Sequence, residues 1–414
     1  MATTDALHAW GAYDRDDPFP VFAEVRELGA VHAVRLADGH DAYLVVGFDE
    51  ARRALNDPRL SKDMHAALAS GDAVVAEGLP GPSFARHVLT VDPPDHTRLR
   101  RLLSVAFTPR RVELLRPRVQ ELVDDLLDDI AAQGADARVD LVRSFAFPLP
   151  FTVICELLGV PEPDRQRLGE GLQGMLVPTD TPEDFAKAKV HSDVVVSMLQ
   201  GLVASKQAGP DDALVSALIS ARDGDERLTT QELLSSIFQL IVAGHDTTAS
   251  LIGNGMVALF RNGDQLAELR SDPTKTASAV EELLRYDAPV PHATFRYAVE
   301  PLSFGEVTIP AGAQVFISLA AADRDGDAFT DPHALDIDRP HSRHLAFGYG
   351  IHFCLGAPLA RMEAQLAFET LLRRFPEMQL AVPSDELHWG HGDGLVLRGL
   401  TELPVTPGQS LPRS

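Results

Sequence analysis

One cysteine lies in a glycine-rich loop whose composition suits a metal ligand. The loop reads Phe347-Gly-Tyr-Gly-Ile-His-Phe-Cys354-Leu-Gly356, and an alanine- and leucine-rich run directly behind it predicts a helix. Gly348, Gly350 and Gly356 would let the backbone turn sharply and approach a flat partner closely. The helix N-terminus would direct free N–H groups at the sulfur and favour the thiolate. A thiolate is a soft, electron-rich ligand that suits iron.

Other interpretations of this cysteine are weaker. A lone cysteine is usually a small buried hydrophobic residue. The chain has two cysteines, Cys155 and Cys354, about 200 residues apart, which supports neither a structural zinc site nor a disulfide. Cys155 lies in an apolar run at 153–158 that predicts a helix, so we interpret it as a core residue.

A second reactive segment lies in the middle of the longest predicted helix. Thr229-Thr-Gln-Glu232 resembles a capping box, and Asn262-Gly263 is a C-cap signal. Between them stands Ala243-Gly-His-Asp-Thr-Thr248, where a hydroxyl beside a carboxylate could pass protons. Gly244 weakens a helix, so we expect local opening with room for water. The alternative, a polar patch on an amphipathic helix, is weakened because the flanking residues are apolar.

The cysteine loop resembles the haem-binding signature of the cytochrome P-450 family, Phe-Gly-x-Gly-x-His-x-Cys-x-Gly, and the match is complete. The resemblance implies that Cys354 is the axial ligand of the iron in haem b (iron protoporphyrin IX). Thiolate ligation gives the iron electron density that favours O–O cleavage. The 243–248 segment resembles the family's oxygen-activation segment. Thr247 would therefore hydrogen-bond dioxygen or a relay water, and Asp246 would connect that relay to solvent.

Buried haem propionates need cationic or donor partners. The segment from Asp92 to Arg98 resembles the family's propionate-binding helix, and the strand residue Arg296 resembles another propionate partner. Any one of these residues could be an ordinary surface cation. The full set in this order argues against that interpretation. The resemblance implies these cofactor contacts: His96, Arg100, Ala243, Arg296, Phe347, His352, Cys354 and Gly356.

Two further segments relate to the loop behind the haem. Glu282 and Arg285 place opposite charges at i and i+3, usually a solvated pair of small energetic value. In the family a buried Glu-x-x-Arg braces this loop, so the resemblance implies a structural role here. Ala322-Asp-Arg-Asp325 departs from the Ala-Asn-Arg-Asp of many relatives, which puts little else in doubt.

The expected fold is mainly α with small β-sheets. We expect the cytochrome P-450 fold, a single large domain over 1–414 with a long central helix and flexible tails at 1–16 and 406–414. Thr108 and Pro109 are typical of an N-cap and first helical position. The remaining pattern predicts a hairpin at 31–46, strands within 294–318 and 394–405, a long loop at 62–90, and helices at 20–28, 111–132, 150–158, 183–205, 211–222, 229–262 and 274–286.

Composition limits the partners and the location. The net charge of −23 and pI of about 5.0 argue against binding to nucleic acid or to an anionic membrane. The N-terminus has no secretory pattern, no run of 18 apolar residues occurs, and thiols are few, so we expect a cytoplasmic protein with no membrane segment. Without a flavin or nicotinamide motif, electrons would come from NAD(P)H through a ferredoxin reductase and a ferredoxin. The docking face would include Arg101, Arg110, Arg111 and Arg361.

We therefore predict a haem-thiolate monooxygenase that hydroxylates a small hydrophobic molecule with O2. A macrolide, another polyketide or a similar secondary metabolite fits best. The alternatives are epoxidation or another oxidation, hydroxylation of a steroid or terpenoid, and a non-catalytic haem-thiolate sensor. His292 could hydrogen-bond the substrate or face solvent. The substrate would lie near 62–90 and 170–190 and contact Leu240, Ala243, Val290, Pro291, His292, Ala293, Thr294 and Leu395.

Overall fold

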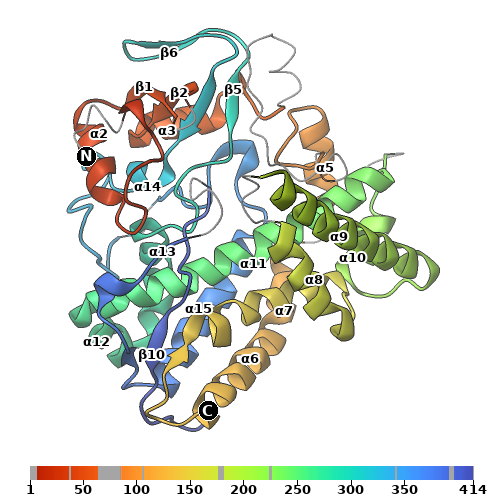
Figure 1. The fold of residues 1–414 in the computed structure, drawn as a ribbon, viewed down its shortest axis with the longest axis vertical. Helices are drawn as coiled ribbons and strands as arrows, with labels where there is room; N and C mark the ends of the chain where they lie inside the picture. Colours follow the sequence, from red (N-terminus) through yellow and green to blue (C-terminus); the bar gives the residue numbers. More distant parts are fainter. Residues whose placement is uncertain are drawn as a thin grey trace. The chain divides into compact units, whose positions relative to one another are not determined.

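The chain forms two compact units in a computed structural model (Figure 1). Unit 1 comprises Met1–Val74, Arg116–Leu149 and Thr247–Ser414, and unit 2 comprises Val75–Leu115 and Pro150–Asp246. A single domain over 1–414 stays a prediction. The structure describes residues 7–36, 39–63, 84, 86–104, 107–175, 181–222, 226–340, 343–390 and 396–413.

Unit 1 contains all the strands of the described chain. Its five-stranded sheet has the order β1-β2-β8-β5-β3, in which β2 and β8 are parallel and the other pairs are antiparallel. A three-stranded sheet, β4-β10-β9, and the hairpin β6-β7 complete the set. The strands are β1 (Val31–Arg35), β2 (Asp41–Val45), β3 (Leu60–Ser61), β4 (Val139–Asp140), β5 (Arg296–Ala298), β6 (Leu302–Phe304), β7 (Val307–Ile309), β8 (Gln314–Ile317), β9 (Gln379–Leu380) and β10 (Pro404–Thr406).

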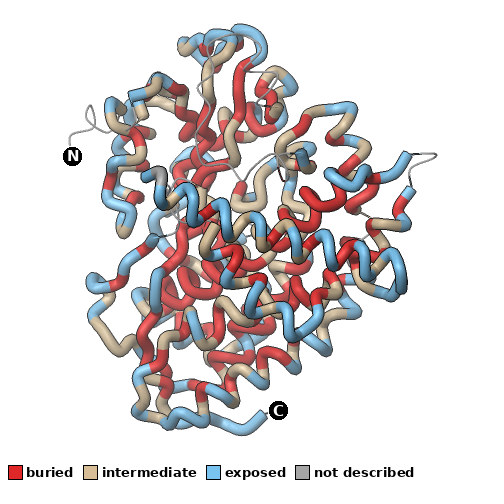
Figure 2. The backbone as a smooth tube through the Cα atoms, turned by 45° about the vertical axis from the view of Figure 1, so that its right-hand side comes forward, coloured by how far each residue is buried: buried red, intermediate tan, exposed pale blue. Residues whose placement is uncertain are grey.

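The helices of unit 1 alternate between buried and exposed residues along their length, and most of the buried ones are apolar. Figure 2 shows this alternation of burial along the backbone. A Cβ at Gly255 would lie 2.6 Å from the Phe368 ring and 3.2 Å from Leu283, so this glycine lets three helices approach closely. The helices are α2 (Phe19–Glu27), α3 (Phe48–Asn56), α12 (Gly263–Ser271), α13 (Thr276–Tyr286), α14 (Leu319–Ala322) and α15 (Ala357–Arg374), with a π-turn at Val142–Ala146 and 3-10 turns at Pro273–Lys275, Gly350–His352 and Ser384–Glu386.

The regular elements in the described residues of unit 2 are helices. Its helices are α5 (Asp95–Ser104), α8 (Glu162–Met175), α9 (Pro182–Ala208) and α10 (Leu214–Ser220). Three helices cross the boundaries between the units in sequence: α6 (Pro109–Ala132), α7 (Pro148–Leu158) and α11 (Thr230–Arg261). Within the described residues no single helix could cross a membrane by length and composition, although the bent pair Val142–Leu158 and Glu162–Met175 passes that test together.

The sequence signals for helix ends are confirmed. The Thr229 N–H donates to Glu232 Oε2 at 2.8 Å, and the Glu232 N–H donates to Thr229 Oγ1 at 3.2 Å, which is the predicted capping box. The Arg111 N–H donates to Thr108 Oγ1 at 3.3 Å. The mainly helical composition with small sheets is also as predicted.

Four helices were missing from the prediction: α3, α8, α12 and the short α14. Helix α8 holds three glycines, which lower helix propensity in the sequence pattern. In the structure they serve packing, because a Cβ at Gly171 would come within 2.8 Å of Val195, and one at Gly174 within 2.4 Å of His191. Tertiary packing against α9 therefore overrides local propensity.

Both segments predicted as tails make contacts within unit 1. Trp10 is 1% exposed, and its ring stacks with that of Phe22. Its backbone forms an isolated β-bridge with Leu36. At the other end the Leu411 N–H donates to the Arg374 carbonyl at 2.8 Å. In the described residues 7–16 and 406–413, the structure thus packs these segments instead of leaving them loose.

Candidate active site

The cysteine loop is built by two glycines in the left-handed region. Gly348 has φ 72° and Gly350 has φ 75°, conformations that other residues rarely adopt. The Gly348 N–H donates to the Leu345 carbonyl at 2.7 Å, and the Cys354 N–H donates to the Phe347 carbonyl at 2.9 Å. These bonds fold the loop back on itself and leave Cys354 half-buried and not in a disulfide.

The start of α15 lies directly behind the sulfur. Helix α15 begins at Ala357 with Gly356 as its N-cap, and a Cβ at Gly356 would lie 4.0 Å from the Cys354 Sγ. A helix N-terminus favours negative charge nearby. The predicted relation between loop, sulfur and helix is therefore present in the geometry.

A half-buried ion pair contacts the first aromatic residue of the loop. The Arg361 guanidinium lies 4.5 Å from the centre of the Phe347 ring and donates twice to Glu281, each bond 2.7 Å long. His344 contacts the same carboxylate at 3.1 Å. Burial opposes ionisation of Glu281, but the bonds from Arg361 and His344 outweigh it and lower its pKa to about 2. Arg361 is thus engaged within unit 1, and sequence reasoning missed both of its partners.

The Glu282–Arg285 pair is buried and forms the centre of a larger network. The two side chains are 2% and 0% exposed, and Arg285 donates to both Glu282 oxygens at 2.8 Å. Arg285 also donates to the carbonyls of Asp323, Pro332 and Ala334. The structure therefore joins α13 to the segment that leads into the cysteine loop, in keeping with a structural role.

Asp323 links this network to the loop itself. Its side chain is fully buried, and its Oδ1 accepts the Leu345 N–H at 2.7 Å, two residues before Phe347. Among the described residues none donates to its Oδ2. Burial raises the pKa of Asp323 to about 7, against opposing effects of His344 and Arg285. A neutral carboxylic acid fits this site better than a carboxylate, and asparagine would fit it too.

Asp323→Asn is expected to stabilise the protein most at neutral and alkaline pH. In the unfolded chain this carboxyl ionises near 3.8, and in the folded protein near 7. Between these values the folded state holds a proton that the unfolded state has lost, so its stability falls as pH rises, and above pH 7 the penalty is constant. The largest penalty that this pKa difference can impose on the free energy of unfolding is on the order of 4 kcal/mol. Urea unfolding of the wild type and the variant at pH 5 and pH 8 measures how much more stable the variant is at each pH. An equal gain in stability at both pH values would contradict the prediction.

The predicted opening of the long helix is wrong. Helix α11 is continuous from Thr230 to Arg261. A Cβ at Gly244 would lie 3.3 Å from Ile154, so this glycine allows close packing on α7 instead of a break. Thr247 still follows Asp246 directly within the helix, and the Asp246 side chain is 14% exposed.

One face of α11 is more open than its surroundings. Leu240, Ala243 and Thr247 stand at i, i+3 and i+7, which places them on one helix face. Ala243 is exposed and the other two are half-buried, and the stretch 239–247 as a whole is less buried than residues 232–238 and 248–259 on either side of it. Predicted substrate and oxygen-activation residues thus share a single open face.

The four predicted propionate partners are distributed over both units. In unit 2, His96 is 2% exposed and Arg100 is half-buried, one turn apart on α5. In unit 1, Arg296 is 3% exposed and donates to the carbonyls of Thr294 and Leu55 at 3.3 Å each, and His352 is half-buried in the loop. Within unit 1, a thiol on a glycine-turned loop and the buried guanidinium of Arg296 fit an iron porphyrin with acidic side groups.

The predicted substrate segment runs beside the five-stranded sheet. The Ala293 N–H donates to the Ile317 carbonyl at 2.9 Å, and Val290 packs on the neighbouring core. Sequence reasoning missed Lys62, a 5% exposed residue whose Nζ bonds the Thr294 hydroxyl and, at 2.9 Å, its carbonyl. An isolated lysine in a loop gave no signal of this contact. Leu395 and most of 62–90 lie outside the described residues, as do residues 176–180.

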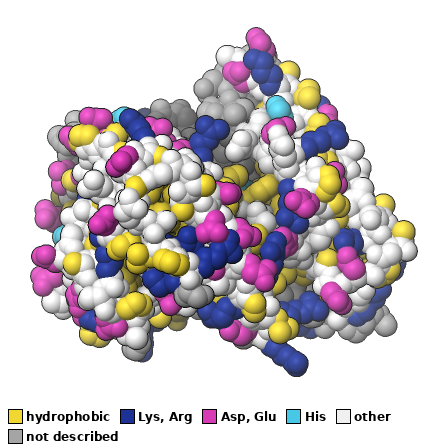
Figure 3. All heavy atoms as spheres, turned by 90° about the horizontal axis from the view of Figure 1, so that it is seen from below, with side chains coloured by type: hydrophobic (Ala, Val, Ile, Leu, Met, Phe, Trp, Pro, Cys, Tyr) yellow, Lys and Arg dark blue, Asp and Glu magenta, His cyan; other side chains and the backbone are white. Residues whose placement is uncertain are grey.

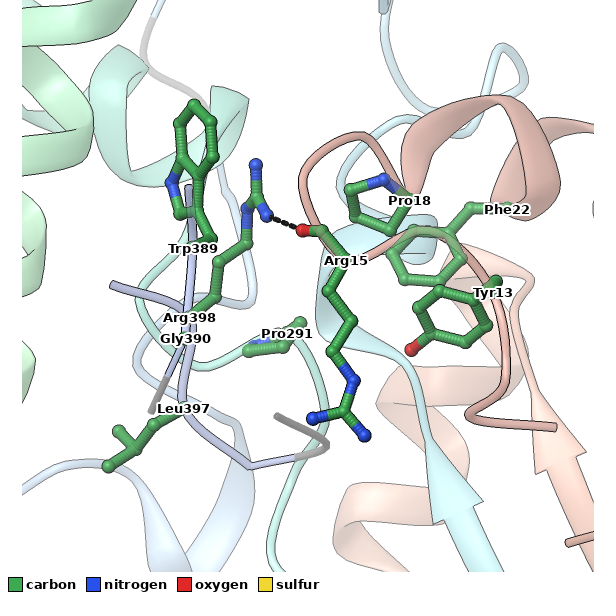
Figure 4. Close-up of a pocket in the computed structure, with 9 residues that line it drawn as sticks. All are labelled: Tyr13, Arg15, Pro18, Phe22, Pro291, Trp389, Gly390, Leu397 and Arg398. Carbon is green, nitrogen blue, oxygen red and sulfur yellow. Dashed lines mark hydrogen bonds between the residues drawn. The ribbon is translucent and has the colours of Figure 1, made fainter. Parts of the chain in front are cut away.

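His292 does not face solvent, so that alternative is wrong. Its ring is 1% exposed and lies 5.7 Å from the rings of both Trp10 and Phe22. The preceding residue, Pro291, lines a small cavity with Tyr13 and other residues (Figure 4). Figure 4 also shows the bond from Arg398 to the Arg15 carbonyl at the wall of this cavity. The complete lining is Tyr13, Arg15, Pro18, Phe22, Pro291, Trp389, Gly390, Leu397 and Arg398.

Comparison with known proteins agrees with this geometry. The family model for cytochrome P450 matches residues 175–389. The monooxygenase PikC of Streptomyces venezuelae is 46% identical over 95% of this chain and 93% of its own length. Cytochrome P450 107B1 of Saccharopolyspora erythraea is 45% identical over 94% of each chain. The solved structure of the P450 monooxygenase TamI with bound tirandamycin C superimposes with a TM-score of 0.84 at 44% identity, covering 95% of this chain and 98% of that one.

The chain belongs to the cytochrome P450 family. Its fold is the predicted P-450 fold, and its activity is that of a haem-thiolate monooxygenase. Such an enzyme needs a substrate, dioxygen and a redox partner that supplies electrons.

Proposed function

We propose that this enzyme hydroxylates a macrolide or another polyketide-derived secondary metabolite. The observation that carries the proposal is the less buried stretch 239–247 of α11, which lies between two buried stretches and has the exposed Ala243 at its centre. Leu240 and Ala243 would offer an apolar wall there beside the acid–alcohol pair. The 6-deoxyerythronolide B hydroxylase of Saccharopolyspora erythraea, 42% identical over 94% of this chain, supports the substrate class, as does TamI with its bound tirandamycin C. Electrons would arrive from NAD(P)H through a ferredoxin reductase and a ferredoxin, in the cytoplasm.

A ligand titration tests the substrate class. Macrolides, linear polyketides, steroids and terpenoids would be added in turn to the ferric enzyme, and the low- to high-spin shift recorded. Tightest binding by a macrolide or polyketide supports the proposal, with product analysis to follow. A shift given only by steroids or terpenoids would replace it with the alternative substrate class.

The predicted site residues would bind the cofactor or position the substrate. Haem b, when bound, would supply oxygen activation, and the Cys354 thiolate would hold its iron. Phe347 and Gly356 would shape the loop around that ligand, and Arg296, His352, His96 and Arg100 would offer donors to the propionates. Ala243 and Thr247 would border the reacting side of the cofactor. The segment from Val290 to Thr294, together with Leu240 and Leu395, would position the substrate and exclude water.

Thr247→Ala is expected to uncouple electron consumption from hydroxylation. The hydroxyl of Thr247 would hold the last position of a proton path that passes Asp246, so its loss diverts reducing equivalents to peroxide. A fall in product per NAD(P)H of about 100-fold is the lower end of the usual contribution of a positioned proton donor. The measurement is product and peroxide per NAD(P)H consumed, and retained coupling would exclude the relay role. Thr248→Ala, a buried neighbour, is the matched control.

Charge reversal at Arg101, Arg110 and Arg111 is expected to slow reduction by an acidic ferredoxin. All three are exposed, and charge complementarity acts mainly on the rate of association. On the face shown in Figure 3, acidic and basic side chains are interspersed, so local charge matters more than the net charge. Arg361 is left intact because it holds Glu281 and Phe347. Stopped-flow reduction at low and high salt is the measurement, and unchanged rates at low salt would refute the docking role.

A further inference from the structure

His245 stands directly before the acid–alcohol pair and is engaged at both ring nitrogens. Its side chain is 3% exposed. Nδ1 lies 2.6 Å from the Ile241 carbonyl oxygen, one turn earlier on α11, and Nε2 lies 3.1 Å from Asp246 Oδ1. The Phe151 ring of α7 packs on the imidazole edge-to-face at 5.4 Å, and Ile154 packs against the adjacent Gly244. The ring is therefore fixed in place by its packing as well as its bonds.

The chemistry of these two contacts determines the proton count. A backbone carbonyl only accepts hydrogen bonds, so Nδ1 must carry a proton. A carboxylate also only accepts, whereas a neutral imidazole protonated at Nδ1 has a lone pair at Nε2. The 3.1 Å contact is favourable only if a proton lies between Nε2 and Oδ1. The pair must then hold one proton more than a neutral histidine beside a carboxylate.

We infer that His245 and Asp246 form a proton-holding pair that loads Asp246 for delivery toward Thr247. This inference rests on the proposed function of Asp246 and Thr247 and extends it to a residue outside the acid–alcohol pair. When Asp246 releases a proton, the proton shared with His245 Nε2 is the one that leaves, and His245 becomes neutral. The Nε2 lone pair then faces a carboxylate, an unfavourable contact that uptake of one proton from water relieves.

The electrostatic surroundings agree with a protonated ring. Burial alone would lower the pKa of His245, but the hydrogen bond and charge of Asp246, aided by the Ile241 carbonyl, raise it above 6.5. From α7 the ring is faced by the uncharged Phe151, and from α11 by Asp246. His245 acts through Asp246, so it is a positioning and proton-holding residue.

Nitrogen-15 NMR of histidine-labelled protein tests the inference without turnover. The ferrous carbon monoxide complex is diamagnetic, and His245→Phe, which keeps a ring against Phe151, identifies the signals of His245 among the 15 histidines. We expect both ring nitrogens to be protonated at pH 6.5 and to be protonated still at pH 7. Asp246→Asn, which removes the charge, should return the ring to a neutral form at pH 7. A neutral His245 in the wild type, or a titration unaffected by Asp246→Asn, would overturn the inference.

Coupling measurements separate a proton role from a merely structural one. His245→Phe should lower product per NAD(P)H and change its pH dependence, with substrate affinity retained. His191→Phe, a half-buried histidine on α9, is the control and should change neither. A pH profile identical to wild type in His245→Phe would count against the inference. Loss of the thiolate–carbon monoxide band in the wild type would instead refute the proposed function, and the NMR titration would still report on the pair.

Discussion

Arg285→Leu is expected to lower the free energy of unfolding by about 3–5 kcal/mol, because it leaves Glu282 ionised and buried without its main partner. The arginine is 0% exposed and makes two bonds to Glu282 and three to backbone carbonyls. Arg339 also donates to Glu282 at 3.1 Å, so part of the charge stays compensated. Urea unfolding monitored by far-UV circular dichroism gives the free energy.

The same variant is expected to lose the cysteine loop before the rest of the fold. Arg285 contacts the carbonyl of Asp323, whose side chain holds Leu345 at the start of the loop. The haem content per chain should therefore fall below that of the wild type. Lys189→Ala removes an exposed pair with Asp193 and is the control, with stability close to wild type. If Arg285→Leu were as stable as this control, the pair would not brace the loop.

Cys354→His is expected to abolish oxygenation while the protein still binds haem. Imidazole can ligate iron, but it lacks the electron donation of a thiolate that favours O–O cleavage. The reduced carbon monoxide complex should absorb at the shorter wavelength typical of histidine ligation. Cys155→Ser is the control, since Cys155 is fully buried and burial raises its pKa to about 12, which leaves its thiol inert. Substantial hydroxylation by Cys354→His would remove Cys354 from its assigned role.

The sequence predicted best where local chemistry decides the structure. The capping box at Thr229, the N-cap at Thr108 and the cysteine loop with Gly348 and Gly350 each depend on neighbouring residues, and each is present. Helix α8 was missed because its glycines are explained only by the distant helix on which they pack.

Long-range contacts explain the other differences at the site. The ion pair between Arg361 and Glu281 joins residues that are 80 positions apart in the chain. The hydrogen bond from Lys62 to Thr294 joins residues that are 232 positions apart. No local pattern reveals such pairs. The burial of His292 depends likewise on Trp10 and Phe22, which come from the first part of the chain.

The optical spectrum of the dithionite-reduced wild-type protein with carbon monoxide tests the central claim most directly. We expect a Soret band at the wavelength that gives the family its name, because Cys354 would ligate the iron as a thiolate. A band at the shorter wavelength of histidine or protonated thiol ligation would contradict the assignment of Cys354. The absence of any haem band in protein expressed with a haem precursor would contradict the whole account.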